Sequence, residues 1–544
     1  MISPVLRRTS EHRPQLDPLL LVAGLGAFGW AMVRTFPQLV TGLTYLPDLV
    51  SPMVIADSLA TTTGPQDVAF GTYAPYTTVW FNSLTRRLPF HRELWEVGPL
   101  LLSLVGVGLL IWVAWRLAGW WAALATAALG LVWSQPVIIT FIAQAIHGTT
   151  YFVVCVLAAF LAMIAGRRRS LGVTSAATVV VGVVAGVNLA SDALLLLVGI
   201  APLVGAPALA AARTWSRPNR RALVVSAAAG VVAVVVSTIT VAVMRASGLH
   251  AVGVSEGSPL SLAAPGEIVD NVRRLGGHVL DIWSADFLGE GFDVTTVPRA
   301  VLALPALLVL ALPVVLIGRA LWKPDPGEEP SPTGLYFLYW GLVVGALVTG
   351  LIFSELAVEN ADRAVNYLTP VVLAVAATLP IVAARARWSR IGVGVAAGLF
   401  GALSTYDLVV PTPAKPGAPV LAYVAEALPL LDALEARNLR RGYSGYVSAS
   451  VYTYQSEGRL VVRPVLPCLL GPGRLSMCGF FANRVAGWYL PQNGVRTFLI
   501  TDPSPAGVAA APVEFGPPAE IIPIGVQTVF VYSYDIAARF GPTL

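Results

Sequence analysis

Long runs of apolar residues follow one another from Pro18 to about Val410, and polar residues are confined to the gaps between them. A membrane-spanning helix needs about 20 largely apolar residues to cross roughly 30 Å of hydrocarbon. Eleven segments meet this requirement, near 18–36, 97–115, 119–137, 150–166, 171–189, 193–212, 222–244, 300–321, 334–353, 368–384 and 391–410. The pattern predicts an α-helical polytopic membrane protein with about eleven transmembrane helices. The short gaps at 116–119 and 188–192 each leave the count open by one.

Arginines mark every second gap, and this alternation predicts the orientation. Short cytoplasmic loops of membrane proteins carry an excess of Lys and Arg. Arginines occur before the first run and at 116, 167–169, 213–221, 319 and 385–390, whereas 138–149 and 190–193 hold none and 354–367 holds only Arg363. We therefore expect a cytoplasmic N-terminus and an extracytoplasmic C-terminus. The first run lacks a clean cleavage site, so it is predicted to remain as the first helix.

Composition supports a membrane protein and excludes several other classes. The chain is 56% hydrophobic and 12% charged, whereas about a quarter of the residues of soluble domains are charged. The net charge of +5 follows from the cytoplasmic arginines, so we infer no nucleic-acid surface. Two lysines beside many Arg, Ala, Gly and Val residues favour a GC-rich bacterial genome, and hence a multi-pass protein of the bacterial plasma membrane.

Two long outer loops interrupt the transmembrane domain, which is predicted to cover residues 1–410. The first loop, 37–96, contains two segments that read as short helices along the membrane interface, one starting near Ser51 and one over Thr77–Leu88. The second loop, 245–298, has apolar residues at helical spacing from Ile268 to Ile282.

The tail, 411–544, is more polar and opens with a Pro-rich linker. A helix-like run over Leu421–Leu439 precedes four strand-like runs, at Tyr443–Tyr454, Arg459–Val465, Thr497–Asp502 and Thr528–Tyr534. We predict a small extracytoplasmic α/β domain.

Three cysteines fall into two settings. Cys155 lies in a predicted span, where it serves as a small apolar filler. Cys468 and Cys478 lie together in the tail. Because nearby cysteines usually pair in an oxidising compartment, a Cys468–Cys478 disulfide is predicted, the alternative being two free thiols.

The order of these elements resembles the GT-C superfamily of membrane glycosyltransferases. Asp362-Arg363-Ala-Val-Asn-Tyr367-Leu-Thr-Pro370 is similar to an Arg-Tyr-Leu-x-Pro element that often opens a late helix in these enzymes. The stretch from Asn188 to Asp192 resembles a recurrent Ser-Asp-(Pro)-Leu element, with Ala193 where proline is often found. The resemblance implies an inverting transferase for a hexose or pentose. Its donor would be a polyprenyl-phosphate-linked monosaccharide and its acceptor an envelope polysaccharide or glycolipid. The actinobacterial character suggests cell-wall arabinan or mannan.

Such a reaction needs a carboxylate near the acceptor hydroxyl, which loses its proton as it attacks. Asp48 is the first candidate for this general base, because it follows the first helix at the place where the superfamily has its aspartate. The alternative is a cap for the helix that starts near Ser51. Asp57 is the second candidate, and it could equally face water.

Two further pairs of residues are candidates for binding. Arg363 and Tyr367 are expected at the donor phosphate, because a guanidinium matches phosphate oxygens bidentately. Arg363 could instead form an ion pair with Glu359 or Asp362. Asp192 and His147 are candidates for orienting the acceptor, although Asp192 could be the N-cap of the next span.

The sequence gives weaker evidence for metal binding and for nucleotide chemistry. His91, Glu93, Glu96 and His147 are possible ligands, but no two histidines have a ligand spacing, which argues against a zinc site. The resemblance leaves room for a divalent cation (Mg or Mn) between the donor phosphate and a carboxylate. The sequence has no Walker-type loop and no GxSxG element, which argues against ATP hydrolysis and serine-hydrolase chemistry.

Two other functions remain open, a transporter or flippase of lipid-linked sugars and a non-catalytic assembly protein. A transporter needs polar groups near the membrane midplane. An enzyme instead needs Asp48 or Asp57 to converge with Arg363 on one outer cavity that is open to lipid.

Overall fold

The computed structural model describes most of the chain. The described residues are 16–61, 67–70, 81, 83–142, 147–165, 170–251, 262–288, 293–321, 332–355, 364–410, 420–469, 475–480, 482–501, 514–525 and 527–540. Only the backbone is described at 48, 61, 251, 364, 420–426, 469, 475 and 476.

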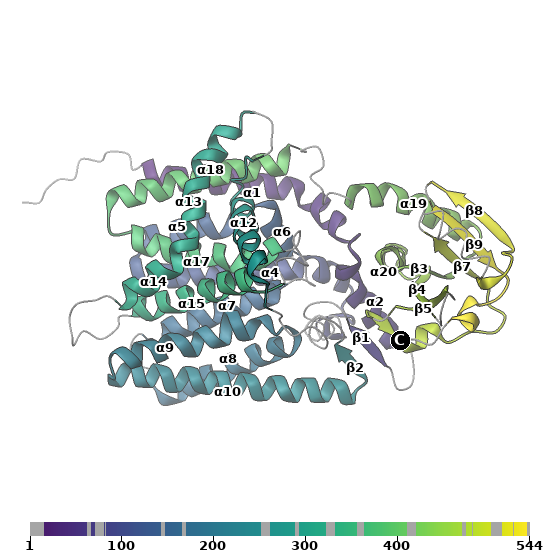
Figure 1. Cartoon of the computed structure of the whole chain (residues 1–544), viewed down its shortest axis with the longest axis horizontal. Helices are drawn as coiled ribbons and strands as arrows, with labels where there is room; N and C mark the ends of the chain where they lie inside the picture. Colours follow the sequence, from purple (N-terminus) through teal and green to yellow (C-terminus); the bar gives the residue numbers. More distant parts are fainter. Residues whose placement is uncertain are drawn as a thin grey trace, which may run out of the picture.

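A bundle of long apolar helices forms the larger part of the molecule, and the tail lies at one end of it (Figure 1). Within the described residues, ten helices are long and apolar enough to cross a membrane. They are α1 (Leu16–Leu43), α4 (His91–Ala118), α7 (Gly148–Ala165), α8 (Leu171–Ser191), η1–α9 (Leu196–Arg213), α10 (Arg217–Ala246), α13–α14 (Thr296–Leu321), α15 (Pro332–Phe353), η3–α17 (Val365–Ala383) and α18 (Arg387–Val409). The chain is therefore a multi-pass membrane protein, as the hydropathy pattern predicts.

The span predicted over 119–137 is not one straight helix. Its residues form α5 (Trp120–Leu131) and α6 (Gln135–Ile142), which meet at 90°. The break follows from the sequence between them, because Val132 is extended and Pro136 cannot continue the hydrogen bonding of a preceding helix. The Trp133 indole donates to the Gly130 carbonyl at 2.7 Å and closes the end of α5. Counting this bent pair as one span gives the eleven that the sequence predicts.

Glycines allow two helix pairs to approach closely. A Cβ atom on Gly401 of α18 would lie 2.8 Å from Gly24 Cα of α1, and one on Gly186 of α8 would lie 2.6 Å from the Ala233 carbonyl of α10. Because both obstacles are backbone atoms, neither can move aside as a side chain could. These pairs are held together by close packing, which is the main source of helix association in lipid.

The first predicted outer loop differs from its prediction in two ways. Helix α1 continues past Pro37 to Leu43. Helix α2 (Pro47–Thr61) has residues 50–56 buried, several of them in a cluster shared with the tail, so these side chains do not face lipid as an interfacial helix was expected to. Of the second predicted helix, 77–88, residues 77–80 and 82 lie outside the described residues.

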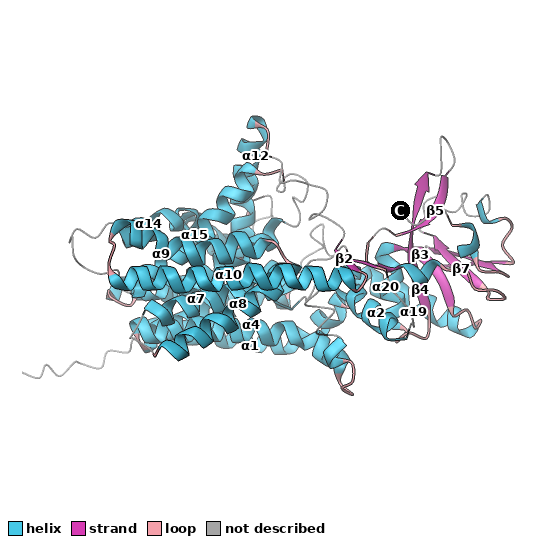
Figure 2. Cartoon of the chain, turned by 90° about the horizontal axis from the view of Figure 1, so that it is seen from below, coloured by secondary structure: helices cyan, strands magenta, loops and turns pink. Residues whose placement is uncertain are grey.

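The helix predicted in the second loop is confirmed as α12 (Pro265–Ile282). The Glu267 carboxylate accepts from the Ala264 amide at 2.8 Å and caps its start. Leu275, Val279 and Ile282 are buried, whereas Val272 is 50% exposed, so the buried face is narrower than the apolar spacing indicates. Figure 2 shows α12 running across the direction of the spans.

The tail is a mixed α/β unit. After α19 (Val420–Ala436), its sheet has the order β5-β4-β3-β7-β9-β8. The strands are β3 (Arg441–Gly445), β4 (Val461–Leu469), β5 (Leu475–Gly479), β7 (Thr497–Thr501), β8 (Glu520–Ile524) and β9 (Gln527–Tyr532). The strand predicted over Tyr443–Tyr454 is wrong from Tyr446 onward, where the chain forms helix α20 (Tyr446–Gln455). Strands β3 and β4 are parallel, and parallel neighbours need a crossover that is usually a helix.

A second, three-stranded sheet joins both outer loops to the tail. Its central strand β1 (Val68–Phe70) pairs in parallel with β2 (Leu249–Ala251) and antiparallel with β6 (Arg484–Val485). One cluster of buried side chains also includes residues of α2, β1 and the tail, among them Val54, Phe70 and Phe498. The tail and the first loop therefore share a core.

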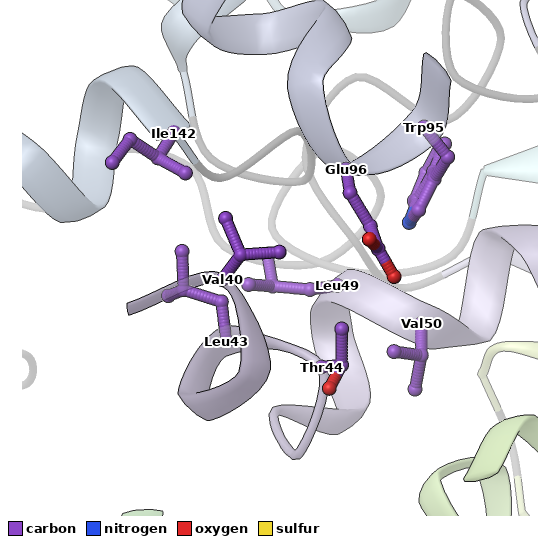
Figure 3. A pocket seen from close by; sticks show the side chains of 8 residues that line it. All are labelled: Val40, Leu43, Thr44, Leu49, Val50, Trp95, Glu96 and Ile142. Atoms are coloured by element: carbon purple, nitrogen blue, oxygen red, sulfur yellow. The ribbon is translucent and has the colours of Figure 1, made fainter. Parts of the chain in front are cut away.

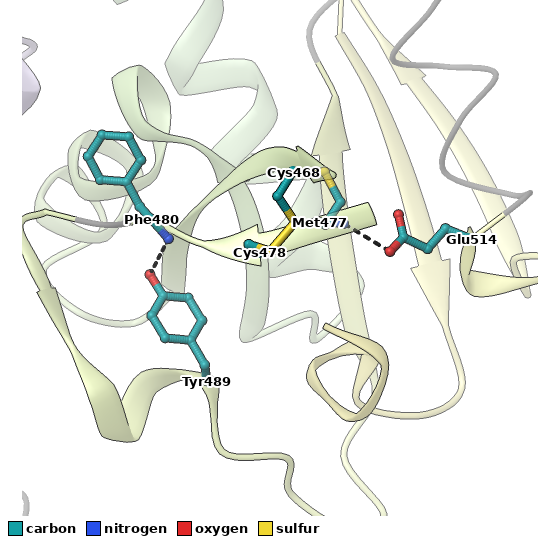
Figure 4. The surroundings of a disulfide bond; sticks show 6 residues. All are labelled: Cys468, Met477, Cys478, Phe480, Tyr489 and Glu514. Atoms are coloured by element: carbon teal, nitrogen blue, oxygen red, sulfur yellow. Dashed lines mark hydrogen bonds between the residues drawn. A yellow bond between two sulfur atoms is a disulfide. The ribbon is translucent and has the colours of Figure 1, made fainter. Parts of the chain in front are cut away.

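The predicted disulfide is confirmed. Cys468 and Cys478 are bonded across the antiparallel pair β4–β5, with their Cα atoms 5.8 Å apart (Figure 4). In the same hairpin the Met477 amide donates to Glu514 at 2.9 Å, and the Phe480 amide donates to the Tyr489 hydroxyl at 3.2 Å. The hairpin is thus attached to the rest of the tail on both sides.

Candidate functional site

A buried polar network lies at the end of the bundle nearer the tail, here called the tail side. It consists of His147, Thr150, Asn188 and Asp192. His147 Nδ1 lies 2.6 Å from Asp192 Oδ2, and the Thr150 hydroxyl donates to the same oxygen at 2.5 Å. The Asn188 amide donates to Thr150 Oγ1 at 2.9 Å. Two predicted site residues, 45 positions apart in the sequence, are thereby brought into direct contact.

The backbone explains why these side chains meet. His147 and Thr150 lie at the start of α7, whereas Asn188 lies in the last turn of α8 and Asp192 directly follows that helix. Asp192 Oδ1 also accepts from the Leu194 amide at 3.0 Å, so the capping interaction expected of Asp192 is present as well. The two oxygens of one carboxylate thus serve different purposes, one holding the turn and the other holding His147.

The contacts of Asp192 lower the pKa of its carboxyl group. Burial by itself raises the pKa of this carboxyl, but the charge of His147 and the hydrogen bonds from His147, Thr150 and the Leu194 amide outweigh it and lower the pKa. The contact of Asp192 with Nδ1 fixes the orientation of the His147 ring.

Aromatic side chains enclose the imidazole. The ring of Tyr367 lies 4.8 Å from that of His147, centroid to centroid, and the Tyr151 ring lies at 6.0 Å. The Tyr151 hydroxyl donates to the Asn366 carbonyl at 3.0 Å, which fixes the turn η3 (Ala364–Leu368) against α7. Three of the predicted site residues, His147, Asp192 and Tyr367, therefore form one cluster.

The other predicted site residues are placed less completely. Arg363 lies outside the described residues and directly precedes η3 in the sequence. Asp48 belongs to the first turn of α2, but its side chain lies outside the described residues. The Asp57 side chain is 54% exposed, and its Oδ1 lies 3.9 Å from Arg86 Nε. Partial burial raises the pKa of Asp57 against the opposing charges of His91, Arg86 and Arg92.

A cleft opens beside the first turn of α2, and we call it the tail-side cleft (Figure 3). It is formed by the ends of α1, α4 and α6 and the start of α2. Its lining residues are Val40, Leu43, Thr44, Leu49, Val50, Trp95, Glu96 and Ile142. Six of these are apolar, and Glu96 is the one ionisable group among them. Asp48 directly precedes Leu49, whereas Asp57 lies seven residues beyond Val50, about 10 Å further along the helix.

Tail residues hold both polar groups of this cleft. The Tyr454 hydroxyl donates to Glu96 Oε1 at 2.9 Å, and the Gln455 amide donates to Thr44 Oγ1 at 2.9 Å. Arg92 Nε donates to the Tyr454 hydroxyl at 3.1 Å, and its guanidinium carbon lies 4.1 Å from the centre of that ring. We call Arg92, Glu96, Tyr454 and Gln455 the docking cluster.

No group of three or more metal-ligating side chains occurs among the residues that the structure describes. Glu96, one of the ligand candidates in the sequence, is instead held by Tyr454, and His147 is held by Asp192. A divalent cation between the donor phosphate and a carboxylate stays a prediction.

Sequence reasoning missed three residues of the site, Thr150, Asn188 as a hydrogen-bonding group, and Glu96 as the polar group of the cleft. Asn188 could have been found, because a polar side chain in an otherwise apolar span usually faces a partner inside the bundle. Glu96 could not, because its partner Tyr454 is 358 residues away in the chain.

The structure is similar to three solved structures of two proteins. ArnT from Cupriavidus metallidurans in the apo state matches 95% of this chain and 100% of its own, with a TM-score of 0.47 and 14% identity. The same protein bound to undecaprenyl phosphate matches 95% and 99%, with a TM-score of 0.42 and 14% identity. The Archaeoglobus fulgidus oligosaccharyltransferase in complex with Zn and sulfate matches 82% and 61%, with a TM-score of 0.39 and 13% identity.

No protein-family model and no curated protein matches the sequence. At 13–14% identity and TM-scores of 0.39–0.47, these similarities assign no role to any residue, and the roles proposed below follow from the residues of this chain.

Proposed function

We propose that this chain is a glycosyltransferase of the GT-C type. It would move a monosaccharide from a polyprenyl-phosphate donor to an envelope polysaccharide or glycolipid acceptor on the extracytoplasmic face. The observation that carries this proposal is the buried His147–Asp192 pair, enclosed by Tyr367 where helix ends meet on the tail side. An ionised carboxylate that holds an imidazole in a buried polar network is a typical arrangement for binding or protonating an anion.

The chemistry assigns a role to each group. The acceptor hydroxyl oxygen forms a bond to the anomeric carbon while the bond from that carbon to the phosphate oxygen breaks. The phosphate leaves with the electron pair, and Asp48 takes the hydroxyl proton. Arg363 and Tyr367 bind the phosphate, and the His147 ring beside Tyr367 adds a polar group near it. Asp192 acts through His147 and is therefore a positioning residue.

The distribution of charge favours an enzyme over a transporter. Ionisable side chains of the described spans gather toward the helix ends, as do Arg299 and Asp407, which pair at 2.6 Å between the start of α13 and the end of α18. A transporter needs polar groups at the midplane. The 90° break between α5 and α6 is a feature that favours a transporter or flippase, since such proteins often break their helices.

The test is transfer of radiolabelled sugar from polyprenyl-phosphate donors in membranes that contain wild type, Asp48→Asn or Asp57→Asn at matched expression. Asp432→Asn, an exposed position in α19, is the control. We expect Asp48→Asn to lose transfer by about 100-fold or more, as is usual for a general base. Loss in Asp57→Asn alone would move the base to Asp57. No transfer by wild type with any donor would contradict the proposed function.

A further inference from the structure

We propose that the tail-side cleft binds the uncharged, hydroxyl-bearing headgroup of the acceptor, presented by an amphiphile from the adjoining leaflet. This inference rests on the proposed function and names the acceptor class. The cleft has a polar end at Thr44 and Glu96, and the rest of its lining is apolar, with Val40 and Leu43 on α1 and Ile142 on α6. An amphiphile with a sugar or polyol headgroup has the same division between its two ends.

The Glu96 carboxylate has one oxygen in place for such a ligand. All its contacts with described residues go to Oε1, which accepts from Tyr454 and lies 3.8 Å from Arg92 Nε. Oε2 is therefore left for a hydroxyl donor in the cleft. Figure 3 shows the carboxylate pointing into the space between α4 and the start of α2. A hydrogen bond from a neutral hydroxyl to an ionised carboxylate is stronger than one between two neutral groups.

The sign of the charge at this end selects against a phosphate. A carboxylate repels a second anion placed a few ångströms away, and low-dielectric apolar walls strengthen the repulsion. Arg92 offsets this only in part, because its Nη1 also lies 3.5 Å from Glu457. The cleft thus suits a neutral acceptor and disfavours the polyprenyl phosphate, whose phosphate is expected at Arg363 and Tyr367.

The tail sets the geometry of the polar end. Tyr454 and Gln455 are consecutive residues at the end of α20, and each holds one of the two polar cleft residues. Helix α6, which carries Ile142 of the cleft, also contacts η3 and α7, the elements that carry Tyr367 and Thr150. An acceptor headgroup in the cleft would therefore lie between the tail that recognises it and the network proposed for the donor.

The experiment uses the full chain in phosphatidylcholine nanodiscs and two photoreactive probes with the same diazirine-bearing acyl chain. One probe is a neutral monohexosyl-diacylglycerol and the other is the anionic phosphatidylglycerol. Labelled residues are mapped by mass spectrometry. We expect the neutral probe to label the peptides of Val40 and Ile142 about tenfold more than the anionic probe does, a difference of about 1.4 kcal/mol.

Three variants make the result specific. Val40→Trp fills the cleft and should reduce neutral labelling to background, whereas Val33→Trp places the same side chain on the 79%-exposed face of α1 and should not. Glu96→Gln preserves size and should remove most of the preference between the probes. Equal labelling by both probes in wild type, or equal labelling in Val40→Trp and Val33→Trp, would overturn the proposal.

This outcome is separable from that of the proposed function. Selective labelling by a protein that transfers no sugar would contradict the enzyme and leave the cleft as a binding site for neutral lipids. Active transfer without selective labelling would contradict the cleft alone.

Discussion

The polar network and the docking cluster both join residues that are far apart in the chain, yet they lie in different surroundings. The side chains of His147 and Asp192 are each 4% exposed. Those of Arg92 and Glu96 are 30% and 25% exposed, and that of Glu457 is 71% exposed. Water and salt screen the docking cluster, whereas the network is shielded. Hydrogen bonds and ion pairs should therefore control the chemistry in the polar network, whereas in the docking cluster they should mainly hold the tail in place.

The largest expected effect tests the shielded region. Asp192→Asn keeps the size of the side chain and removes the charge that holds His147. We expect transfer to fall by about 100-fold or more, equivalent to about 2.7 kcal/mol in the barrier. Transfer is measured at matched expression, with Asp432→Asn as the exposed counterpart. A variant as active as wild type would show that the network is structural.

The next largest effect is expected from removing the disulfide, which should change the stability of the tail without changing its docking on the bundle. Replacing both Cys468 and Cys478 by serine opens a loop closed over a separation of ten residues. The loss in free energy of unfolding of the tail should be about 2–3 kcal/mol on the chain-entropy account. Hydrogen exchange of the full-length protein reads out the tail and the bundle separately. Equal loss of protection in both would show that they unfold as one unit.

A smaller effect tests the docking cluster itself. Tyr454→Phe removes the hydroxyl that joins Arg92 to Glu96 and should weaken docking by about 1 kcal/mol. The change is followed by the rate of proteolysis in the linker after Val410. Tyr406→Phe, on a half-buried residue of α18, is the matched control. An effect as large as that of Asp192→Asn on transfer would remove the distinction between the two regions.

The smallest effect is expected for an exposed ion pair of the tail, Arg437 with Glu520. Arg437 Nε and Glu520 Oε1 lie 3.3 Å apart with both side chains about two-fifths exposed. Arg437→Gln should change the free energy of unfolding of the tail by less than about 0.5 kcal/mol. A larger loss of unfolding free energy in a denaturant titration would show that this exposed ion pair stabilises the tail more than is expected for a pair screened by water and salt.

The spans were largely predictable because each depends on about 20 consecutive residues. The break at Val132 was not, because a proline near the end of an apolar run fits either a kinked span or two short helices. Helix α20 was mistaken for a strand since Tyr446–Tyr454 is rich in Tyr, Val and Thr, which favour strands. The need for a crossover between parallel β3 and β4 overrides that preference.

The candidate site was predictable in its residues and less so in its contacts. Short motifs pointed to Asp192 and Tyr367, but nothing local shows that both lie against His147. The shared core is harder still, since β1 pairs with strands near residues 250 and 485. Such pairings are decided by the whole fold, and one sequence does not contain a local signal for them.

The most direct test of the central claim uses proteoliposomes that contain the purified protein and a labelled polyprenyl-phosphate sugar, with acceptor glycolipid on the tail side. Sugar transfer and movement of the donor between leaflets are measured in the same vesicles, for wild type and Asp192→Asn. We expect transfer by wild type, loss of transfer in the variant, and no protein-dependent movement of the donor. Movement of the donor without transfer would contradict the enzyme and favour a flippase.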